Sequence, residues 1–227
     1  MSTAAVDSRL SRFWRASIGK KVVMAVTGLV LFGFLIGHVI GNLQVFAGAE
    51  KINAYSEFLH HSPGILWGTR SILLVALILH VTAAVQLYAQ KAAARPQKYA
   101  KWARRTSSLP SRWMLWSGFA ILFFVIYHLM HFTLGVKAVH PTFVEGDVYQ
   151  NMISAFQTPY VAAIYIVAMS LLAAHLFHGL YSMFQSFGIA HPGWTPRIKA
   201  FAVIFSLVLA AAFAVIPIAI LAGYGAG

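Results

Sequence analysis

Five apolar segments, each long enough to cross a lipid bilayer, limit the fold more than any other feature of this sequence. A transmembrane helix needs about 20 predominantly apolar residues, and the segments cover residues 22–44, 68–90, 113–135, 159–185 and 199–222. Hydrocarbon offers the backbone no hydrogen-bond partners, so a spanning segment must satisfy its own groups as a helix. We therefore expect an all-α membrane protein whose residues 1–227 form one domain, a bundle of five transmembrane helices.

The composition excludes several other classes of protein. Hydrophobic residues make up 59% of the chain and charged residues only 10%, against about 25% charged residues in an ordinary globular protein. The sequence contains no cysteine, which excludes a disulfide framework, a thiolate metal site and an iron–sulfur cluster held by this chain. The first apolar segment is longer than a signal-peptide core and lacks a cleavage site, so we interpret it as a retained helix.

The basic residues predict how the bundle lies in the membrane. Fourteen of the 17 Lys and Arg residues fall in the N-terminal tail, in the 91–112 connection and near 197–199, which alternate to one side. By the positive-inside rule the N-terminus is cytoplasmic and the C-terminus lies outside. Topology thus accounts for most of the formal charge of +12, and we expect no nucleic acid partner. The same basic face suits an acidic cytoplasmic partner.

One histidine lies inside each of the first four apolar segments. An ionisable ring in hydrocarbon is costly and indicates a functional site by default. Counted from the basic side at 1.5 Å per residue, His38 lies ~27 Å and His128 ~24 Å into the bilayer. On the same count His80 lies ~16 Å and His175 ~14 Å from that side. The four histidines therefore form an outer pair and an inner pair, about 10 Å apart.

Two histidine pairs at different depths favour two b-type haems. Each haem iron takes one axial ligand from each face of the ring, and two imidazoles leave no open position for oxygen, which favours electron transfer. We expect His38 and His128 to bind the outer haem iron, and His80 and His175 the inner one. A single zinc or copper site would need all four side chains close together, which the two depths argue against. The small residues beside the ligands would let the ring approach the helices: Gly37, Gly41 and Gly179.

Other residues near these positions leave alternatives open. His131 and His178 each follow a candidate ligand by three residues and lie near the same helix face, so spacing alone does not choose between them. A second histidine could bind a haem propionate, line a quinone pocket or contact a neighbouring helix. Arg112, at the start of the third segment, is a further candidate near haem or quinone. The histidines of the connecting segments are expected to be exposed to solvent: His60, His61, His140 and His191.

The first and third segments share a short pattern, Met-x-x-[Ser/Thr]-Gly followed by histidine ten residues after the glycine. It runs from Met24 through Gly28 to His38, and from Met114 through Gly118 to His128. A duplicated two-helix unit would explain it, and so would chance similarity between apolar helices. The fifth segment has no histidine, and we expect it to act as packing support.

Four motifs give the chain a resemblance to a known family. They are Ile36-Gly-His38, Leu79-His80-Val-x-Ala-Ala, Gly118-Phe-Ala-x7-His128 and His175-Leu-Phe-His-Gly179-Leu-Tyr181. The chain resembles the single-chain, five-helix, two-haem cytochrome b anchor of succinate dehydrogenases and fumarate reductases. In that family the third-helix ligand lies ten residues after the glycine and the fourth-helix ligand four residues before Gly-Leu-aromatic. The resemblance therefore selects His128 and His175 over their neighbours.

The resemblance implies a place in succinate:quinone oxidoreductase, the succinate dehydrogenase of the tricarboxylic acid cycle or a fumarate reductase. The anchor would sit in a bacterial cell membrane and hold a flavoprotein subunit and an iron–sulfur subunit on its cytoplasmic face. FAD, iron–sulfur clusters and the dicarboxylate chemistry belong to those subunits, and this chain carries no catalytic residue. Electrons would pass through the inner and outer haems to a quinone, often menaquinone in the two-haem type. A higher oligomer is compatible with the resemblance.

Two other classes of protein share some of these features. The cytochrome b subunit of another quinone-linked oxidoreductase, of the formate dehydrogenase or hydrogenase type, also uses few helices and two haems. A transporter or channel with a histidine proton relay would place histidines in membrane helices without haem.

Overall fold

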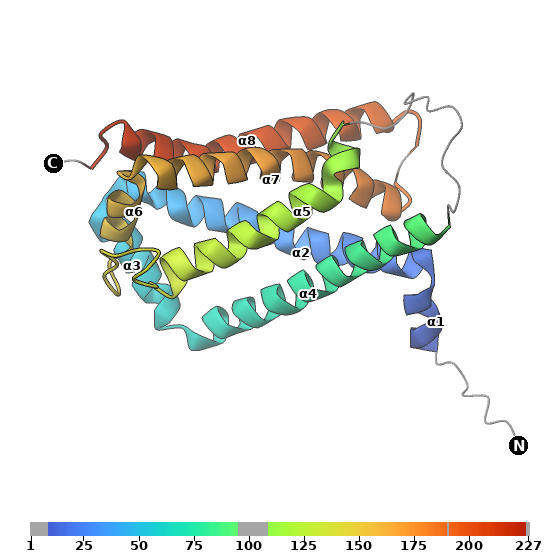
Figure 1. Cartoon of the computed structure of the whole chain (residues 1–227), viewed down its shortest axis with the longest axis horizontal. Coiled ribbons are helices and arrows are strands. Elements are labelled where there is room, and N and C mark those ends of the chain that lie inside the picture. The colour runs from blue at the N-terminus through green and yellow to red at the C-terminus, as the bar shows by residue number, and fades with distance from the viewer. Residues whose placement is uncertain (1–8, 95–108, 190, 226–227) are drawn as a thin grey trace, which may run out of the picture.

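Long helices that share one direction make up most of the chain (Figure 1). The computed structural model describes residues 9–94, 109–189 and 191–225. Within these ranges five helices are long and apolar enough to cross a membrane, which confirms the five predicted spans. They are α2 (Ser17–Leu43), α4 (Pro63–Ala93), α5 (Leu109–His128), α7 (Pro159–Ser186) and α8 (Thr195–Leu221).

The helices extend beyond several of the predicted boundaries. The helix α2 begins at Ser17 instead of residue 22, and α4 begins at Pro63 instead of residue 68. Proline is favoured in the first turn of a helix because its missing N–H group would have no intrahelical partner there. The helices α4, α7 and α8 all have a proline in this turn. Hydropathy identifies only the apolar part of a span, whereas the helix itself extends into the polar residues on either side.

Short helices close the two ends of the bundle. At the end that holds the N-terminus lies α1 (Arg9–Arg15), and at the opposite end lie the 3-10 helix η1 (Gln44–Ala47), α3 (Ala49–His60) and α6 (Val148–Phe156). The sequence pattern indicates only connecting segments there, because α3 and α6 are too short to give the signal of a span. A side-chain network joins them: Asn53 Nδ2 donates to Asp147 Oδ1 at 3.0 Å, and the Tyr149 N–H donates to Asn53 Oδ1 at 3.0 Å.

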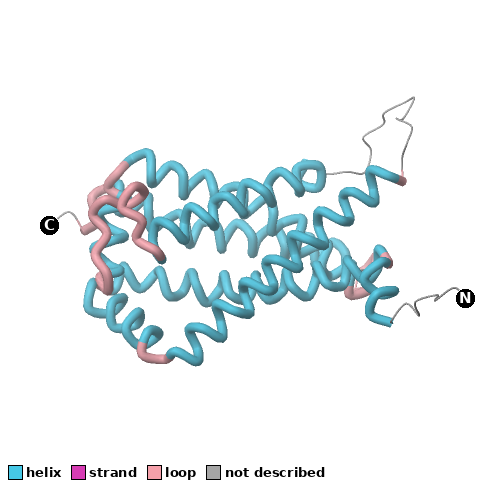
Figure 2. The backbone as a smooth tube through the Cα atoms, turned by 60° about the horizontal axis from the view of Figure 1, so that its bottom comes forward, coloured by secondary structure: helices cyan, strands magenta, loops and turns pink. Residues whose placement is uncertain are grey.

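The spans lie side by side between the two ends of the molecule, as the tube view shows (Figure 2), and α7 has the most extensive packing among them. The helix α7 packs against α8, α5 and α2, while α4 packs mainly on α2 and meets α5 only sparsely. Buried apolar side chains gather around α7 and α8, among them Leu172, Leu176 and Leu209. By contrast, α4 buries only Ala76 and Ala83. Of the five spans in the described part of the chain, α4 and α5 thus bury the smallest share of their residues.

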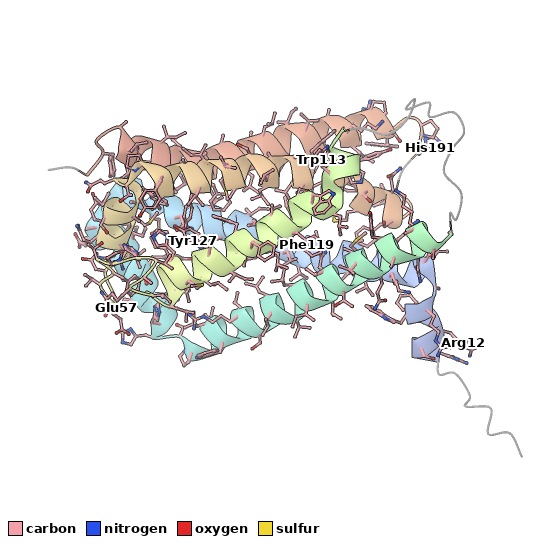
Figure 3. The ribbon with its side chains drawn as sticks, viewed as in Figure 1. Arg12, Glu57, Trp113, Phe119, Tyr127 and His191 are labelled. Atoms are coloured by element: carbon pink, nitrogen blue, oxygen red, sulfur yellow. The ribbon has the colours of Figure 1, made fainter. Side chains whose placement is uncertain are left out.

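The two ends of the bundle differ in charge. Arg12 and His191 lie at the end that holds the N-terminus, and Glu57 lies at the α3–α6 end (Figure 3). The four acidic residues in the described ranges all lie on or next to α3 and α6: Glu50, Glu57, Glu145 and Asp147. The helix α1, where the described chain begins, and the last turn of α8 lie at opposite ends (Figure 1), as an odd number of spans requires.

A substitution at Gly135 tests the turn that follows the third span. Gly135 has φ of 56°, and an added Cβ would collide with the ring of Phe143. We expect Gly135→Ala to destabilise the protein by about 1–3 kcal/mol, the usual range for a residue held in an unfavourable backbone region. Thermal unfolding in detergent measures this. Gly68→Ala is the control, because Gly68 has open space around its Cβ position; equal stability of the two variants would contradict the prediction.

Candidate functional site

The outer pair of histidines comes together between α2 and α5. The rings of His38 and His128 have centres 5.8 Å apart and planes at 83° to each other. A metal–imidazole bond is about 2 Å long, so two imidazoles on opposite sides of one metal ion have ring centres roughly 6 Å apart. Aromatic rings from three helices surround the pair: Phe34 on α2, Phe124 on α5 and Phe213 on α8. The spacing suits one shared iron.

The inner pair is held by hydroxyl groups of neighbouring helices. His80 Nδ1 on α4 lies 3.2 Å from Thr27 Oγ1 on α2. His175 Nδ1 on α7 lies 3.3 Å from Ser117 Oγ on α5. Each inner histidine therefore lies against a hydroxyl group of the helix beside it, and the pairing of His80 with His175 on one haem stays a prediction.

The inner contacts and the outer histidines follow the same spacing on α2 and α5. On each helix the hydroxyl residue, Thr27 or Ser117, precedes the outer histidine by eleven residues, which is about 16 Å along a helix axis. The two histidine pairs are therefore separate sites. In the described part of the chain no three His, Asp or Glu side chains gather in a group that could hold one metal ion.

Three of the four rings use Nδ1 for a hydrogen bond with a hydroxyl group. The partners are Thr27 for His80, Ser117 for His175 and Tyr165 for His128, the last at 3.2 Å. Within the described ranges the Nε2 atoms of these rings have no hydrogen-bond partner in the protein. A metal-binding histidine usually holds a partner on its other ring nitrogen, which fixes the ring's orientation. The residues present therefore fit axial coordination of a haem iron through Nε2.

Comparison with known proteins decides between the classes that the sequence left open. A family model described as succinate dehydrogenase/fumarate reductase transmembrane subunit matches residues 91–216. The match covers more than half of the chain and includes His128 and His175. The chain belongs to this family. None of the curated proteins or solved structures compared with it matches.

His131 of this transmembrane subunit lies behind His128 and does not contact His38. Its ring is 1% exposed, and its Nδ1 lies 3.0 Å from the Tyr165 hydroxyl oxygen, which also contacts His128. Residues Leu129–Thr133 form a π-helix, η2, a local widening that is frequent at functional sites. His128, which precedes this turn, and His131, which lies in it, both contact the Tyr165 hydroxyl group. Of the two histidines that spacing left open, only His128 is paired with His38.

His140 is a correction to the sequence analysis, which expected it to be exposed. It is 2% exposed, with Nδ1 3.3 Å from the His131 carbonyl oxygen and Nε2 3.2 Å from Ser154 Oγ. Its ring also packs on that of His131, with centres 4.6 Å apart. The segment after the third span folds back over the end of the bundle, which hydropathy does not reveal. His60, His61 and His191 are exposed, as expected.

The glycines beside the histidines differ in what they face. A Cβ added at Gly37 or Gly179 would meet no atom within 4 Å, so space is open beside these positions. A Cβ at Gly41 would lie 2.8 Å from the Tyr55 ring. Gly41 therefore admits a tyrosine from α3, where the sequence analysis expected a cofactor ring.

Two of the predicted surrounding residues add little to the site. His178 is half-buried on α7, one turn from His175. The Arg112 side chain lies outside the part of the chain that the structure describes.

The glycines that sequence reasoning did not select lie next to the inner pair. A Cβ at Gly28 would lie 3.3 Å from His80 Cε1, and one at Gly118 would lie 3.5 Å from His175 Cε1. Both glycines, and the hydroxyl residues before them, belong to the pattern shared by the first and third segments. That pattern could have identified these residues from the sequence, because it repeats the hydroxyl residue and the glycine that contact each inner histidine.

The buried ring of His140 predicts a pH dependence of stability. Desolvation lowers the pKa of His140, and the charge of Lys137 acts in the same direction against a raising contribution from the His131 carbonyl. An unfolded histidine titrates near about 6.5. Below that pH the unfolded chain binds a proton that the folded chain does not, so stability falls as the pH falls.

The comparison of two proteins isolates the contribution of His140. We expect the parent protein to lose more thermal stability than His140→Gln between pH 7.5 and pH 5, because glutamine has no ring to protonate. Unfolding in detergent at the two pH values measures the difference. Equal losses in the two proteins would contradict the assignment to His140.

Proposed function

We propose that this transmembrane subunit binds two b-type haems and carries electrons through them between an iron–sulfur subunit and a quinone. His38 and His128 would hold the outer haem, and His80 and His175 the inner one. The observation that supports this most directly is the arrangement of the two pairs, with Nδ1 on a hydroxyl group in three rings and Nε2 without a protein partner. The family to which the chain belongs indicates the enzyme in which it would act, a succinate dehydrogenase or fumarate reductase.

The protein side chains would set what the haems can do. A bound haem supplies one-electron chemistry at its iron. Imidazole coordination from both faces leaves no position for oxygen, so it favours electron transfer. The aromatic rings around the outer pair and the apolar helices would keep water away from a bound haem. The helices α4 and α5, which would lie on two sides of the haem region, pack only sparsely against each other.

Partners and orientation follow from the charge of the two ends. We place the end with α1 in the cytoplasm, where the flavoprotein and the iron–sulfur subunit would dock near the inner haem. The α3–α6 end would face outward, with the outer haem close to a quinone, menaquinone in this proposal. Each electron moving between the two sides would then cross much of the bilayer, which involves about 2.3 kcal/mol per 100 mV of membrane potential.

Removal of single histidines tests haem coordination. We expect the parent complex to contain two haems per chain, because two histidine pairs are present. His38→Ala and His128→Ala should each lose one haem, whereas His131→Ala should keep both, because His131 is not paired with His38. A reduced-minus-oxidised visible spectrum and the haem content of the purified complex measure this.

The exposed His191 provides the matched control, since His191→Ala should keep both haems. A parent spectrum without a haem α-band would overturn the proposed function. Loss of a haem in His131→Ala, with full content in His128→Ala, would overturn the choice of ligand alone.

The absence of cysteine from the sequence allows a direct test of orientation. His61→Cys places a thiol at the α3–α6 end, and Ala94→Cys places one at the opposite end, both at exposed positions. We expect a membrane-impermeant maleimide to label His61→Cys on intact cells, and Ala94→Cys only after lysis in detergent. The reverse pattern would contradict the proposed orientation.

A further inference from the structure

We propose that Thr27 and Ser117 are positioning residues that fix the tautomer of the inner histidines. Each hydroxyl oxygen accepts the Nδ1 hydrogen of one ring, so Nε2 of His80 and of His175 keeps the lone pair that would bind the inner haem iron. This inference rests on the proposed function, because it concerns the histidines that would hold the inner haem.

The acceptor to which the Thr27 hydroxyl group donates its hydrogen determines the tautomer of His80. Thr27 Oγ1 lies 2.7 Å from the Val23 carbonyl oxygen and 3.2 Å from that of Met24, both acceptors in the preceding turn of α2. A hydroxyl group has one hydrogen and can still accept. Donation to the carbonyl leaves Oγ1 as an acceptor for His80, so Nδ1 must carry the ring hydrogen.

Ser117 repeats this arrangement on α5. Its Oγ donates to the Met114 carbonyl oxygen at 3.1 Å and lies 3.3 Å from His175 Nδ1. Side chains of serine and threonine commonly bond to a carbonyl three or four residues earlier in a helix. The back-bonding hydroxyl groups, buried in both cases, therefore impose the same tautomer on both inner rings.

The glycine after each hydroxyl residue is part of the same unit. The rings of His80 and His175 pass 3.3 Å and 3.5 Å from the Cβ positions of Gly28 and Gly118. A Cβ at Gly28 would crowd the His80 ring and lengthen its bond to the hydroxyl group, whereas a Cβ at Gly118 would be in ordinary van der Waals contact with His175. The repeated [Ser/Thr]-Gly pair is thus a small structure that seats an imidazole from the other helix of its pair, α4 for α2 and α7 for α5.

The unit serves the inner pair and not the outer one. His128 has its hydroxyl partner on α7, in Tyr165, and no ring hydrogen bond of His38 is present within the described ranges. A hydrogen bond from Nδ1–H to an acceptor makes the imidazole a more basic ligand. A more basic ligand stabilises the ferric form and lowers the reduction potential. Loss of either hydroxyl group should therefore raise the potential of the inner haem alone.

A redox titration of the purified complex, followed at the haem α-band, tests the proposal. Thr27→Val removes the hydroxyl group with little change of shape, and Ser117→Ala removes the other. We expect the midpoint potential of the inner haem to rise by about 59 mV in each variant, which corresponds to a tenfold change at the low end of partner-residue effects. The outer haem should keep its potential.

Two further variants provide controls. Thr27→Ser keeps a hydroxyl group and should restore the parent potential. Ser206→Ala removes a buried hydroxyl group that also bonds back to a carbonyl, that of Ala202 at 2.6 Å, but that has no contact with the histidines within the described residues. It should leave both potentials unchanged.

The outcomes separate this proposal from the function on which it rests. Two one-electron components in the parent support the two-haem function whatever the variants do. Unchanged potentials in both Thr27→Val and Ser117→Ala, or an equal shift in Ser206→Ala, would overturn the tautomer proposal and leave that function intact. A parent without haem would overturn both. If Thr27→Val fails to assemble, Ser117→Ala still decides, because it deletes a single buried atom.

Discussion

The cost of placing an imidazole ring in hydrocarbon governs the architecture of this protein. A buried polar atom without a partner is unfavourable by several kcal/mol in such a medium, so three of the four paired rings have a hydroxyl group against Nδ1. Each of these bonds joins two different helices. The polar contacts therefore do more than satisfy the rings: they set which helices lie together and at what height, in a bundle where apolar packing alone specifies little.

The helices contribute different residues to the two histidine pairs, as this requirement demands. The helix α7 supplies Tyr165 to the outer pair and His175 to the inner one, and it is also the helix around which the apolar core gathers. The helices α2 and α5 each supply an outer histidine and an inner hydroxyl residue. The helix α8 contributes mostly packing, as expected for a span without histidine, although its Phe213 ring lies beside His38.

The sequence predicted the features that depend on composition and spacing. It missed the features that arise where connecting segments fold back over the end of the bundle. Apolar length gave the five spans, and helical rise gave the pairing of His38 with His128. The burial of His140 and the contact of Tyr55 with Gly41 arise from segments that fold back over the α3–α6 end. No local pattern carries that information. Thr27 and Ser117 belong to the repeated pattern, but the pattern alone does not show which histidines they contact, because those histidines lie on other helices.

The π-helix at Leu129–Thr133 has a consequence for how this end of the bundle could have arisen. A π turn contains one more residue than an α turn, so it corresponds to a single inserted codon. In an uninterrupted α-helix the residues beyond it would be rotated by about 100°. The segment after Thr133, which leads to His140, would then start in another direction. The π turn thus sets where the chain goes after the third span, while the outer pair, which precedes the turn, is unaffected.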